Sequence, residues 1–538
     1  MRWARKLWHD HRAAVAPTVA LSLFALIGAG GLAFDYAHMA ALDTELQNAA
    51  DQAALAAATQ LDGQAGAIAR ATAAANSLLT NQTLLANDGL ASGITIPTVR
   101  FYATKAAAEA DTGTASTGTT AVDSAAHFVR VAVLARTAGF ALTPIVGVTG
   151  SGSLNAEAVA GLSSAICKVP PVMICNPNES GDPTFTVANY IGKGIKLVSV
   201  GNGSGTWAPG NFGYLDSSGG SNGAPGLREA LGWNTPPGDC IAATGVSTKP
   251  GASVSVTDAL NTRFDIYDSN VSCTGTGICS ASINSAKDLV RPGNANGGNA
   301  CKLHNSGWQE VAAASQYLPT SATVPLTTGI TPAAMGHPRD MCHAVVSGTA
   351  GACASPIGDG VWDRNAYFRA NYKRSNSTYW TGGTGTGTWQ NNTGLSAAAT
   401  RYQVYAWEIA NRGNAIDGVS VLASRVASGN GASALTSYGL PQCSAGQGYG
   451  SGLIPSATTP DRRRISLAVV NCTASSVNGS STNVPVQKWI EMFLVEPSLN
   501  RARTNAGDVY AEVISETTSG AGATAGQVIR RDTPYLVK

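Results

Sequence analysis

The chain has 538 residues, of which only 13% are charged, about half the share found in an ordinary soluble protein. Its 35 Lys and Arg residues nearly balance 33 Asp and Glu residues, and a net charge of +2 excludes a generally basic nucleic-acid-binding protein. Hydrophobic residues make up 44% of the chain, so it is not broadly disordered. We therefore expect an ordered protein of two or three domains with no nucleic-acid partner, covered largely by Ser, Thr and Asn as envelope proteins are.

The first predicted element is a transmembrane helix at residues 13–34, which contain no charged side chain. A helix of that length measures about 33 Å, enough to cross a bilayer core of about 30 Å. Residues 1–12 carry four basic side chains and one acidic side chain, whereas the first charges after the apolar run are acidic. The positive-inside rule therefore places residues 1–12 in the cytoplasm and the bulk of the chain in the periplasm, anchored in inner-membrane lipid.

The helical pattern continues beyond the span and predicts a helical stalk at residues 35–61. Apolar residues recur there at steps of three and four, which is typical of one helix face. They are Met39, Leu42, Leu46, Ala49, Ala50, Ala53 and Ala57. A cleaved signal peptide with a weak site at Gly31-Leu32-Ala33 is the alternative, but the apolar run is longer than the usual 7–15 residues.

A column of small residues also repeats every four positions along this helix. Its members are Ala25, Ala29, Ala33, Ala37 and Ala41. Small side chains allow the backbone of a second helix to approach closely, so the column predicts a contact face for self-association or for a partner helix. The alternative is that Ala is simply abundant in this region.

The rest of the chain divides into a small α+β head at residues 62–170 and a large, loop-rich, mixed α/β extracytoplasmic domain at residues 171–538. Pro170-Pro171 marks the joint, because consecutive prolines favour an extended backbone. The overall fold class is therefore α+β. The predicted strands span residues 94–102, 127–134, 154–166, 195–200, 464–472, 484–495 and 508–514, and the predicted helices span residues 105–110 and 397–411.

All ten cysteines lie at or beyond residue 167, five of them in a Cys-rich middle segment at about 270–395. An even number of cysteines in Gly-rich, loop-rich sequence predicts disulfides formed in an oxidising compartment. Short spacings suggest Cys167–Cys175, Cys273–Cys279 and Cys342–Cys353 as pairs, although other connectivities remain open. Zinc is the rival interpretation, but Cys301 and His304 are an isolated pair of candidate ligands.

Four strings near the N-terminus carry a specific resemblance. They are His11–Ala16, Gly31–Tyr36, Leu46–Asp51 and Ala53–Ala58. Together these strings resemble the N-terminus of the TadE/TadG-like Flp pilus-assembly family, single-pass envelope proteins of the bacterial tight-adherence (Tad) machinery. The resemblance implies pilus-assembly proteins or pseudopilins as partners and no catalytic residue. It does not imply processing by prepilin peptidase, because residues 13–34 lack the Glu that a prepilin helix carries. Three strings in the large domain are also similar to extracytoplasmic regions of Tad-like proteins: Pro209–Asp216, Asn261–Asp265 and Asp461–Arg464.

Three segments contain residues that could form a binding or catalytic site, and for each of them a structural role is the better explanation. Asp216–Gly220 is similar to the metal-binding loop of von Willebrand A-type domains, but Gly220 replaces one required hydroxyl, which favours a Ser/Gly turn. The polar run His337–His343 favours a structural loop, because proximity in sequence does not pair a base with a nucleophile. Asp359–Arg364 is too short for an EF-hand and favours a turn with an Asp–Arg pair.

These observations predict a non-enzymatic envelope component with no catalytic, metal-binding or cofactor-binding residue. Gly-x-Ser-x-Gly and Walker motifs are absent from the sequence. A surface-exposed or secreted adhesin is the first alternative, and Trp380 and Trp389 would support it if they were exposed. A disulfide-stabilised extracytoplasmic hydrolase is the second alternative, and a pocket that gathered His and carboxylate side chains would support it.

Overall fold

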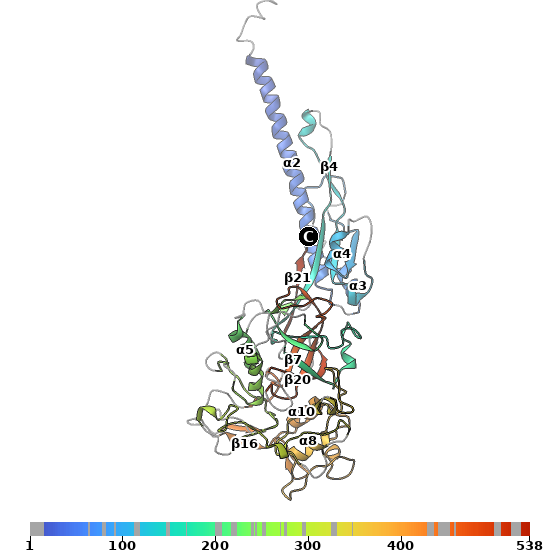
Figure 1. The fold of residues 1–538 in the computed structure, drawn as a ribbon. Helices are drawn as coiled ribbons and strands as arrows, with labels where there is room; N and C mark the ends of the chain where they lie inside the picture. The colour runs from blue at the N-terminus through green and yellow to red at the C-terminus, as the bar shows by residue number, and fades with distance from the viewer. Residues whose placement is uncertain are drawn as a thin grey trace, which may run out of the picture. The chain divides into compact units, whose positions relative to one another are not determined.

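The computed structural model describes two compact units, Met1–Ser164 with Asp532–Lys538 (unit 1) and Ala165–Arg531 (unit 2) (Figure 1). The sequence-based fold class is confirmed: a long N-terminal helix is followed by mixed α/β structure with disulfides. The described residues are 15–537 except 63–64, 78–81, 91–92, 112–118, 147–150, 168, 200–206, 217–222, 238–240, 243–244, 250–253, 269–270, 274–276, 293–296, 324–325, 327–330, 347, 428–434, 439–451, 457–458, 500–506 and 518–528.

The first element of unit 1 is helix α2, Val15–Ala58, a continuous helix of 44 residues. Pro17 does not break it, because the amide groups of a first helical turn need no intrahelical acceptor. The helix is long and apolar enough to cross a membrane by length and composition, over Pro17–Ala58. Its two halves differ sharply in burial: side chains before Gly31 are largely exposed, whereas one face from Leu42 to Ala58 is buried.

The second half of α2 forms one side of the core of unit 1 and does not project as a free stalk. Seven of its side chains, from Leu42 to Ala57, have exposed fractions of 3% or less. They pack against Val129 and Val131 of strand β2 and against Ala71 and Ala75 of helix α3. The predicted apolar stripe is therefore present, and β2 and α3 of unit 1 cover it. Met39, its first member, is half-buried against the same cluster.

A sheet with the order β1-β2-β5-β21 lies in this part of the fold, and strands β3 and β4 form a separate hairpin beside α2 (Figure 1). The bounds are α3 Ala67–Ser77, α4 Lys105–Ala110, β1 Thr98–Tyr102, β2 Phe128–Ala132, β3 Arg136–Gly139, β4 Ser151–Leu154, β5 Glu157–Cys167 and β21 Ile529–Leu536, with short 3₁₀ helices η1 Asp123–Ala125 and η2 Thr143–Val146. Helix α4 has the predicted bounds and begins at a Thr104 N-cap, whose side chain accepts the N–H of Ala107.

Unit 2 is built around a closed ring of six strands. They are β6 Val172–Cys175, β7 Gly194–Ser199, β8 Asn211–Leu215, β18 Arg464–Val470, β19 Val484–Leu494 and β20 Val509–Glu516. They follow one another in the order β19-β18-β6-β8-β7-β20, and β20 pairs again with β19. The pairs β18–β6 and β7–β8 are parallel and the other four are antiparallel. The sheet therefore closes into a barrel, which removes its open edges.

Alternate residues of all six barrel strands belong to one buried cluster, as expected for side chains that face the barrel interior. On β18 these residues are Ile465, Leu467 and Val469, and their paired partners on β19 include Ile490 and Met492. On β18 and β19 the residues between them face outward and are buried as well, because further segments of unit 2 cover this side of the barrel. The near-continuous apolar run of β18 is what such two-sided burial requires.

The remaining elements of unit 2 are short. They comprise β9 Ile241–Ala242, β10 Gly245–Val246, β11 Thr248–Lys249, β12 Leu289–Val290, β13 Gln309–Glu310, β14 Ala415–Ile416, β15 Val419–Ser420, β16 Ser424–Ala427, β17 Leu435–Tyr438, α5 Ala224–Gly232, α6 Val254–Thr257, α7 Met341–Ala344, α8 Arg364–Asn371, α9 Trp389–Thr393, α10 Arg401–Ala410 and 3₁₀ helices η3 Val187–Asn189, η4 Asp258–Phe264, η5 Gly297–Asn299 and η6 Ala313–Ser315. Helix α10 begins at a complete capping box formed by Thr400 and Gln403. Its amphipathic face presents Val404 and Tyr405 to the core.

Two of the three suggested disulfides are confirmed, Cys273–Cys279 and Cys342–Cys353. The suggested pair Cys167–Cys175 is wrong, because Cys175 is bonded to Cys472, 297 residues away in sequence. The two cysteines are brought together because β6 runs parallel to β18 in the barrel and each cysteine lies at or just beyond the end of its strand. Spacing in sequence carries no signal for that pairing. Cys301 is disulfide-bonded as well.

We expect loss of the Cys175–Cys472 bond to destabilise unit 2 more than loss of Cys273–Cys279. The first bond closes a sequence separation of 297 residues and the second a separation of 6. In the chain-entropy model these loops correspond to about 6 and about 2 kcal/mol of unfolding free energy. Paired Cys→Ala variants of the full chain in detergent, unfolded by denaturant, measure both losses. Equal losses would contradict the larger contribution expected of the long-range bond.

Candidate functional site

The first half of α2 presents an apolar surface that no part of the described chain covers. Its large apolar side chains between Val15 and Phe34 have exposed fractions of 49% to 70%. A continuous exposed apolar surface of this kind marks a lipid or protein contact. All five members of the alanine column, from Ala25 to Ala41, are exposed too. This surface is therefore available to lipid or to another helix.

Asp35 ends this surface and is itself only 3% exposed. Its carboxylate accepts hydrogen bonds from the backbone N–H groups of Ala141, Leu142 and Thr143, with N···O distances of 2.7–3.4 Å. It also accepts the hydroxyl of Thr143. The carboxylate thus satisfies the free donors at the start of η2, the short 3₁₀ helix between β3 and β4. Sequence reasoning used Asp35 only as a topology signal and missed this contact.

One turn before Asp35, the helix comes very close to the same loop. A Cβ atom placed on Gly31 would lie 3.0 Å from the Cβ of Leu142 and 3.3 Å from its carbonyl carbon. That separation is shorter than ordinary van der Waals contact, so only Gly fits here without a shift of the loop. Gly31 and Asp35 therefore fix the loop to one face of α2.

We expect Asp35→Ala to release the loop, because three backbone donors would lose a charged acceptor. Hydrogen exchange at Ala141–Thr143 should accelerate about tenfold or more, the effect of losing hydrogen bonds to a charged group. Exchange mass spectrometry of the full chain in nanodiscs measures this change.

Asp43→Ala is the matched control, because Asp43 lies on the same helix and is exposed. Unchanged exchange in Asp35→Ala, or equal acceleration in both variants, would show that the carboxylate does not hold the loop.

The string Asp461–Arg464 lies in the interior of unit 2, and all four side chains are 6% exposed or less. Arg462 donates to the carbonyl oxygens of Trp233, Gly232 and Ser280. Arg463 donates to those of Leu494, Val495 and Asn284. Burial lowers the pKa of Arg463 to about 10, and it remains charged at neutral pH. These guanidinium groups bind backbone carbonyls where several loops cross.

A second string extends the same network. Arg263, within Asn261–Asp265, donates to the carbonyl oxygens of Leu231 and Arg462. Asn261 exchanges hydrogen bonds with the backbone of Ser498 at 2.8 Å in each direction. The two strings singled out in sequence for their resemblance therefore meet in the interior, where they join distant segments of the chain.

The run His337–His343, expected to be a structural loop, joins a buried ion-pair network on the outer face of the barrel. Arg401 of α10 donates to Asp340 and, at 2.8 Å, to Glu512 of β20. Arg339 donates to Glu496 at 2.9 Å. Every side chain in these pairs is less than 10% exposed. Charges buried in this way depend on their partners, since removing one partner leaves an uncompensated charge.

Glu408 of α10 lies in a buried polar cluster between this helix and α8. One carboxylate oxygen accepts the hydroxyls of Tyr367 and Tyr372, both at 2.7 Å, and the other accepts the side-chain amide of Asn284. His337 Nε2 lies 3.7 Å from the same carboxylate. Burial raises the pKa of Glu408 to about 7, against the opposing effect of the two tyrosine hydrogen bonds. Burial also lowers the pKa of His337 well below its usual value, so the imidazole is neutral.

Raising the pH should weaken unit 2 through Glu408. Between about pH 4.5 and pH 7 the folded chain holds a proton on this carboxyl that the unfolded chain releases, so stability falls as the pH rises. Glu408→Gln keeps an acceptor for both tyrosines and cannot ionise. From pH 5 to pH 8 its unfolding free energy should gain about 2–3 kcal/mol relative to the unsubstituted chain, as measured by denaturant unfolding.

Glu491→Gln is the contrasting variant, because Glu491 pairs with buried Arg464. We expect it to cost about 3–5 kcal/mol at both pH values. Parallel pH profiles for Glu408→Gln and the unsubstituted chain would refute the role of Glu408.

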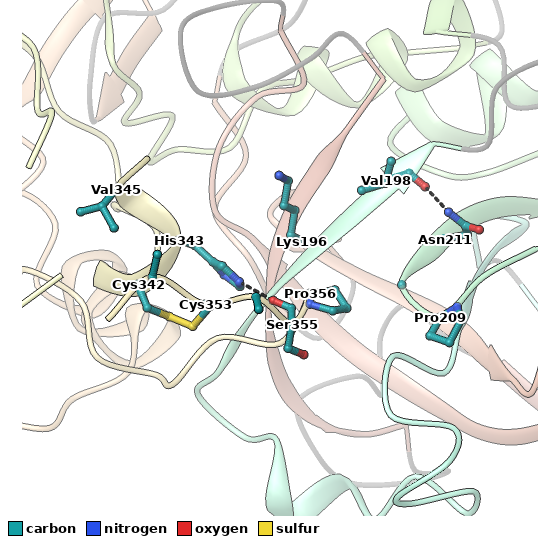
Figure 2. A pocket seen from close by; sticks show the side chains of 13 residues that line it. Lys196, Val198, Pro209, Asn211, Cys342, His343, Val345, Cys353, Ser355 and Pro356 are labelled. Carbon is teal, nitrogen blue, oxygen red and sulfur yellow. Dashed lines mark hydrogen bonds between the residues drawn. A yellow bond between two sulfur atoms is a disulfide. The ribbon is translucent and has the colours of Figure 1, made fainter. Parts of the chain in front are cut away.

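Unit 2 has a pocket of about 450 Å³ beside the Cys342–Cys353 disulfide (Figure 2). His343 and Lys196 line it, and both imidazole nitrogens of His343 are engaged, Nδ1 with the Tyr510 hydroxyl and Nε2 with the Ser355 carbonyl, each at 2.9 Å. The imidazole therefore contacts the backbone of Ser355 and does not face its hydroxyl as a base faces a nucleophile.

The remaining sequence candidates have structural roles where the structure describes them. Cys342, His343 and Cys353 lie close enough to suggest a metal site, but both sulfurs are held in the disulfide. Cys301 is likewise disulfide-bonded and is not a free thiolate beside His304. Of Asp216–Gly220, residues 217–220 lie outside the described residues.

The expected Asp–Arg turn at Asp359–Arg364 is held differently. Asp363 caps α8 by accepting the N–H of Ala366, and Arg364 donates to the carbonyls of Trp362 and Ala399. Helix capping uses the carboxylate that the expected ion pair would have needed. Trp380 and Trp389, the aromatic pair that would have supported adhesion if exposed, are 0% and 1% exposed and belong to the core.

Comparison with known proteins identifies the region that contains the apolar surface and Asp35. Residues 13–60 match the model of the Tad family, described as "Putative Flp pilus-assembly TadE/G-like". The matched segment thus coincides with α2, Val15–Ala58. Neither the curated proteins nor the solved structures contain a significant match to the chain. The chain therefore carries a TadE/G-like Flp pilus-assembly domain at its N-terminal helix.

Proposed function

We propose that this protein is a non-enzymatic, membrane-anchored component of Flp/Tad pilus biogenesis. The observation that carries the proposal is the coincidence of the TadE/G-like segment, residues 13–60, with a helix whose first half is an exposed apolar surface. Family members take part in pilus assembly, so the partners proposed here are other pilus-assembly proteins or pseudopilins and the surrounding inner-membrane lipid.

The proposed orientation places residues 1–12 in the cytoplasm and units 1 and 2 in the periplasm. The excess of basic side chains in residues 1–12 supports this orientation through the positive-inside rule. The disulfides support it independently, because they lie beyond the span and such bonds form outside the reducing cytosol.

A structural role is also favoured by how unit 2 uses its chemistry-bearing side chains. The buried carboxylates Asp340, Glu408 and Glu512 each accept hydrogen bonds from Arg, Tyr or Asn partners inside the core. A hydrolase would need such groups at a site that substrate can enter. Within the described pocket lining, His343 is occupied by Tyr510 and by a backbone carbonyl.

The exposed alanine column of α2 is the surface proposed for helix contacts in the membrane. Lipid tails provide no hydrophobic force between helices, so association depends on close backbone packing, which Ala permits. The partner helix is a second copy of this chain or that of another pilus-assembly protein.

Exchange of the anchor for a cleavable signal peptide separates this proposal from the adhesin alternative. In a strain that lacks the gene, the full chain should restore surface pili, whereas residues 35–538 secreted in soluble form should not. An adhesin would keep its surface-binding activity when secreted. Restoration of pili by the secreted form would overturn the anchored role.

Two double variants then test the helix face in the anchored chain. Ala29→Ile with Ala33→Ile should insert normally but lose co-purification with its partners. Ala20→Ile with Phe24→Ile is the control, because these exposed positions precede Ala29 and Ala33 by nine residues and therefore lie on the opposite side of the helix. Equal co-purification of the two doubles would contradict the contact face.

A further inference from the structure

The loop held by Asp35 is uncharged over its whole length. Strands β3 and β4 form an antiparallel hairpin, and between Arg136 and Glu157 the sequence contains no charged residue. The residues that follow β3 are Phe140, Ala141, Leu142, Thr143, Pro144, Ile145 and Val146, which we call the apolar tip. Ala141, Leu142 and Pro144 are exposed, and 40% of the Leu142 surface is free.

The apolar tip lies beside the last turn of the uncharged run of α2. Leu142 contacts the position of Gly31, which precedes the first charged residue, Asp35, by four residues. Four residues correspond to about 6 Å along a helix axis. If residues 13–34 span the bilayer core, Leu142 lies at the depth of the outermost lipid chains and not in bulk water.

Backbone groups at that depth need internal partners, because the lipid core offers none. The tip meets this requirement through Asp35, which accepts the N–H groups of Ala141, Leu142 and Thr143 and the hydroxyl of Thr143. The carboxylate of Asp35 is engaged in these hydrogen bonds, and the residue is only 3% exposed. The contact therefore leaves the side chains of Ala141, Leu142 and Pro144 exposed while the backbone N–H groups of residues 141–143 have an acceptor.

We propose that the apolar tip inserts into the periplasmic leaflet of the same bilayer that α2 crosses, as a second lipid contact of unit 1. The proposal rests on the membrane span of the proposed function. A single helix leaves the attached unit free to tilt relative to the bilayer. A second lipid contact beside the helix restricts this tilt and fixes the height of unit 1 above the bilayer core.

Photocrosslinking to lipid tests the insertion. p-Benzoylphenylalanine is introduced at Leu142 of the full chain, or at the exposed neighbour Ala141 if the first variant folds poorly. The chain is reconstituted in vesicles of phosphatidylethanolamine and phosphatidylglycerol, irradiated, and analysed for lipid adducts by mass spectrometry. We expect adducts at the tip at a yield close to that of a probe at Leu26, which is 69% exposed within the span.

Val122 provides the matched exposed control, since it is 58% exposed and also apolar. Its neighbour Asp123 accepts the N–H groups of Gly66 and Ile68, so this position lies near the end of α2 that is far from the tip. Several-fold fewer adducts at Val122 than at Leu142 are expected. Adducts at Leu26 without adducts at the tip, or equal yields at Val122 and Leu142, would overturn the insertion alone. Absence of adducts at Leu26 would overturn the membrane span itself.

Discussion

The structure of unit 1 depends on one helix whose two halves have different surroundings. The first half of α2 is uncharged and exposes large apolar side chains, whereas its second half packs small residues against α3 and β2. The large apolar side chains of the first half, Leu and Phe among them, are compatible with lipid. The small side chains of Ala49, Ala53 and Ala57 allow β2 and α3 to approach the helix backbone closely. Asp35 lies where the exposed half of α2 ends. Its carboxylate holds the loop between β3 and β4 against the helix at this position.

Unit 2 shows where a chain with few charges places them. Only 13% of the residues of the whole chain are charged. Unit 2 nevertheless buries four arginine side chains almost completely: Arg263, Arg401, Arg462 and Arg463. Each guanidinium joins segments that are far apart in sequence, through backbone carbonyls or buried carboxylates. Burying such groups costs desolvation, and alternative packings of the loops would leave them unpaired. The network thus selects one arrangement of a loop-rich domain.

The sequence was sufficient for the elements that local pattern determines. Helix α4 and the beginnings of β18 and β19 fall where periodicity placed them, because each is a short run with clear ends. Contacts between distant segments left no local signal: the pairing of β19 with β20 closes the barrel, and Cys175 reaches Cys472 through the parallel pairing of β6 with β18. The string Asp461–Arg464 consists entirely of charged residues, and nothing local in the sequence shows that folding buries all four side chains. Asp35 was visible as a charge, whereas its partners lie more than 100 residues away.

The Tad-like segment therefore contributes more to the chain than an exposed apolar surface. Residues 13–60 include both the exposed apolar surface and the buried face that forms the core of unit 1. A substitution on the buried face, for example at Leu46, disturbs the fold, whereas one at Ala33 alters only what the helix meets outside the chain. Because both faces belong to one rigid helix, the orientation of unit 1 is coupled to the surface that α2 offers to its neighbours. Helix α2 and the rest of unit 1 are in this sense a single structural element.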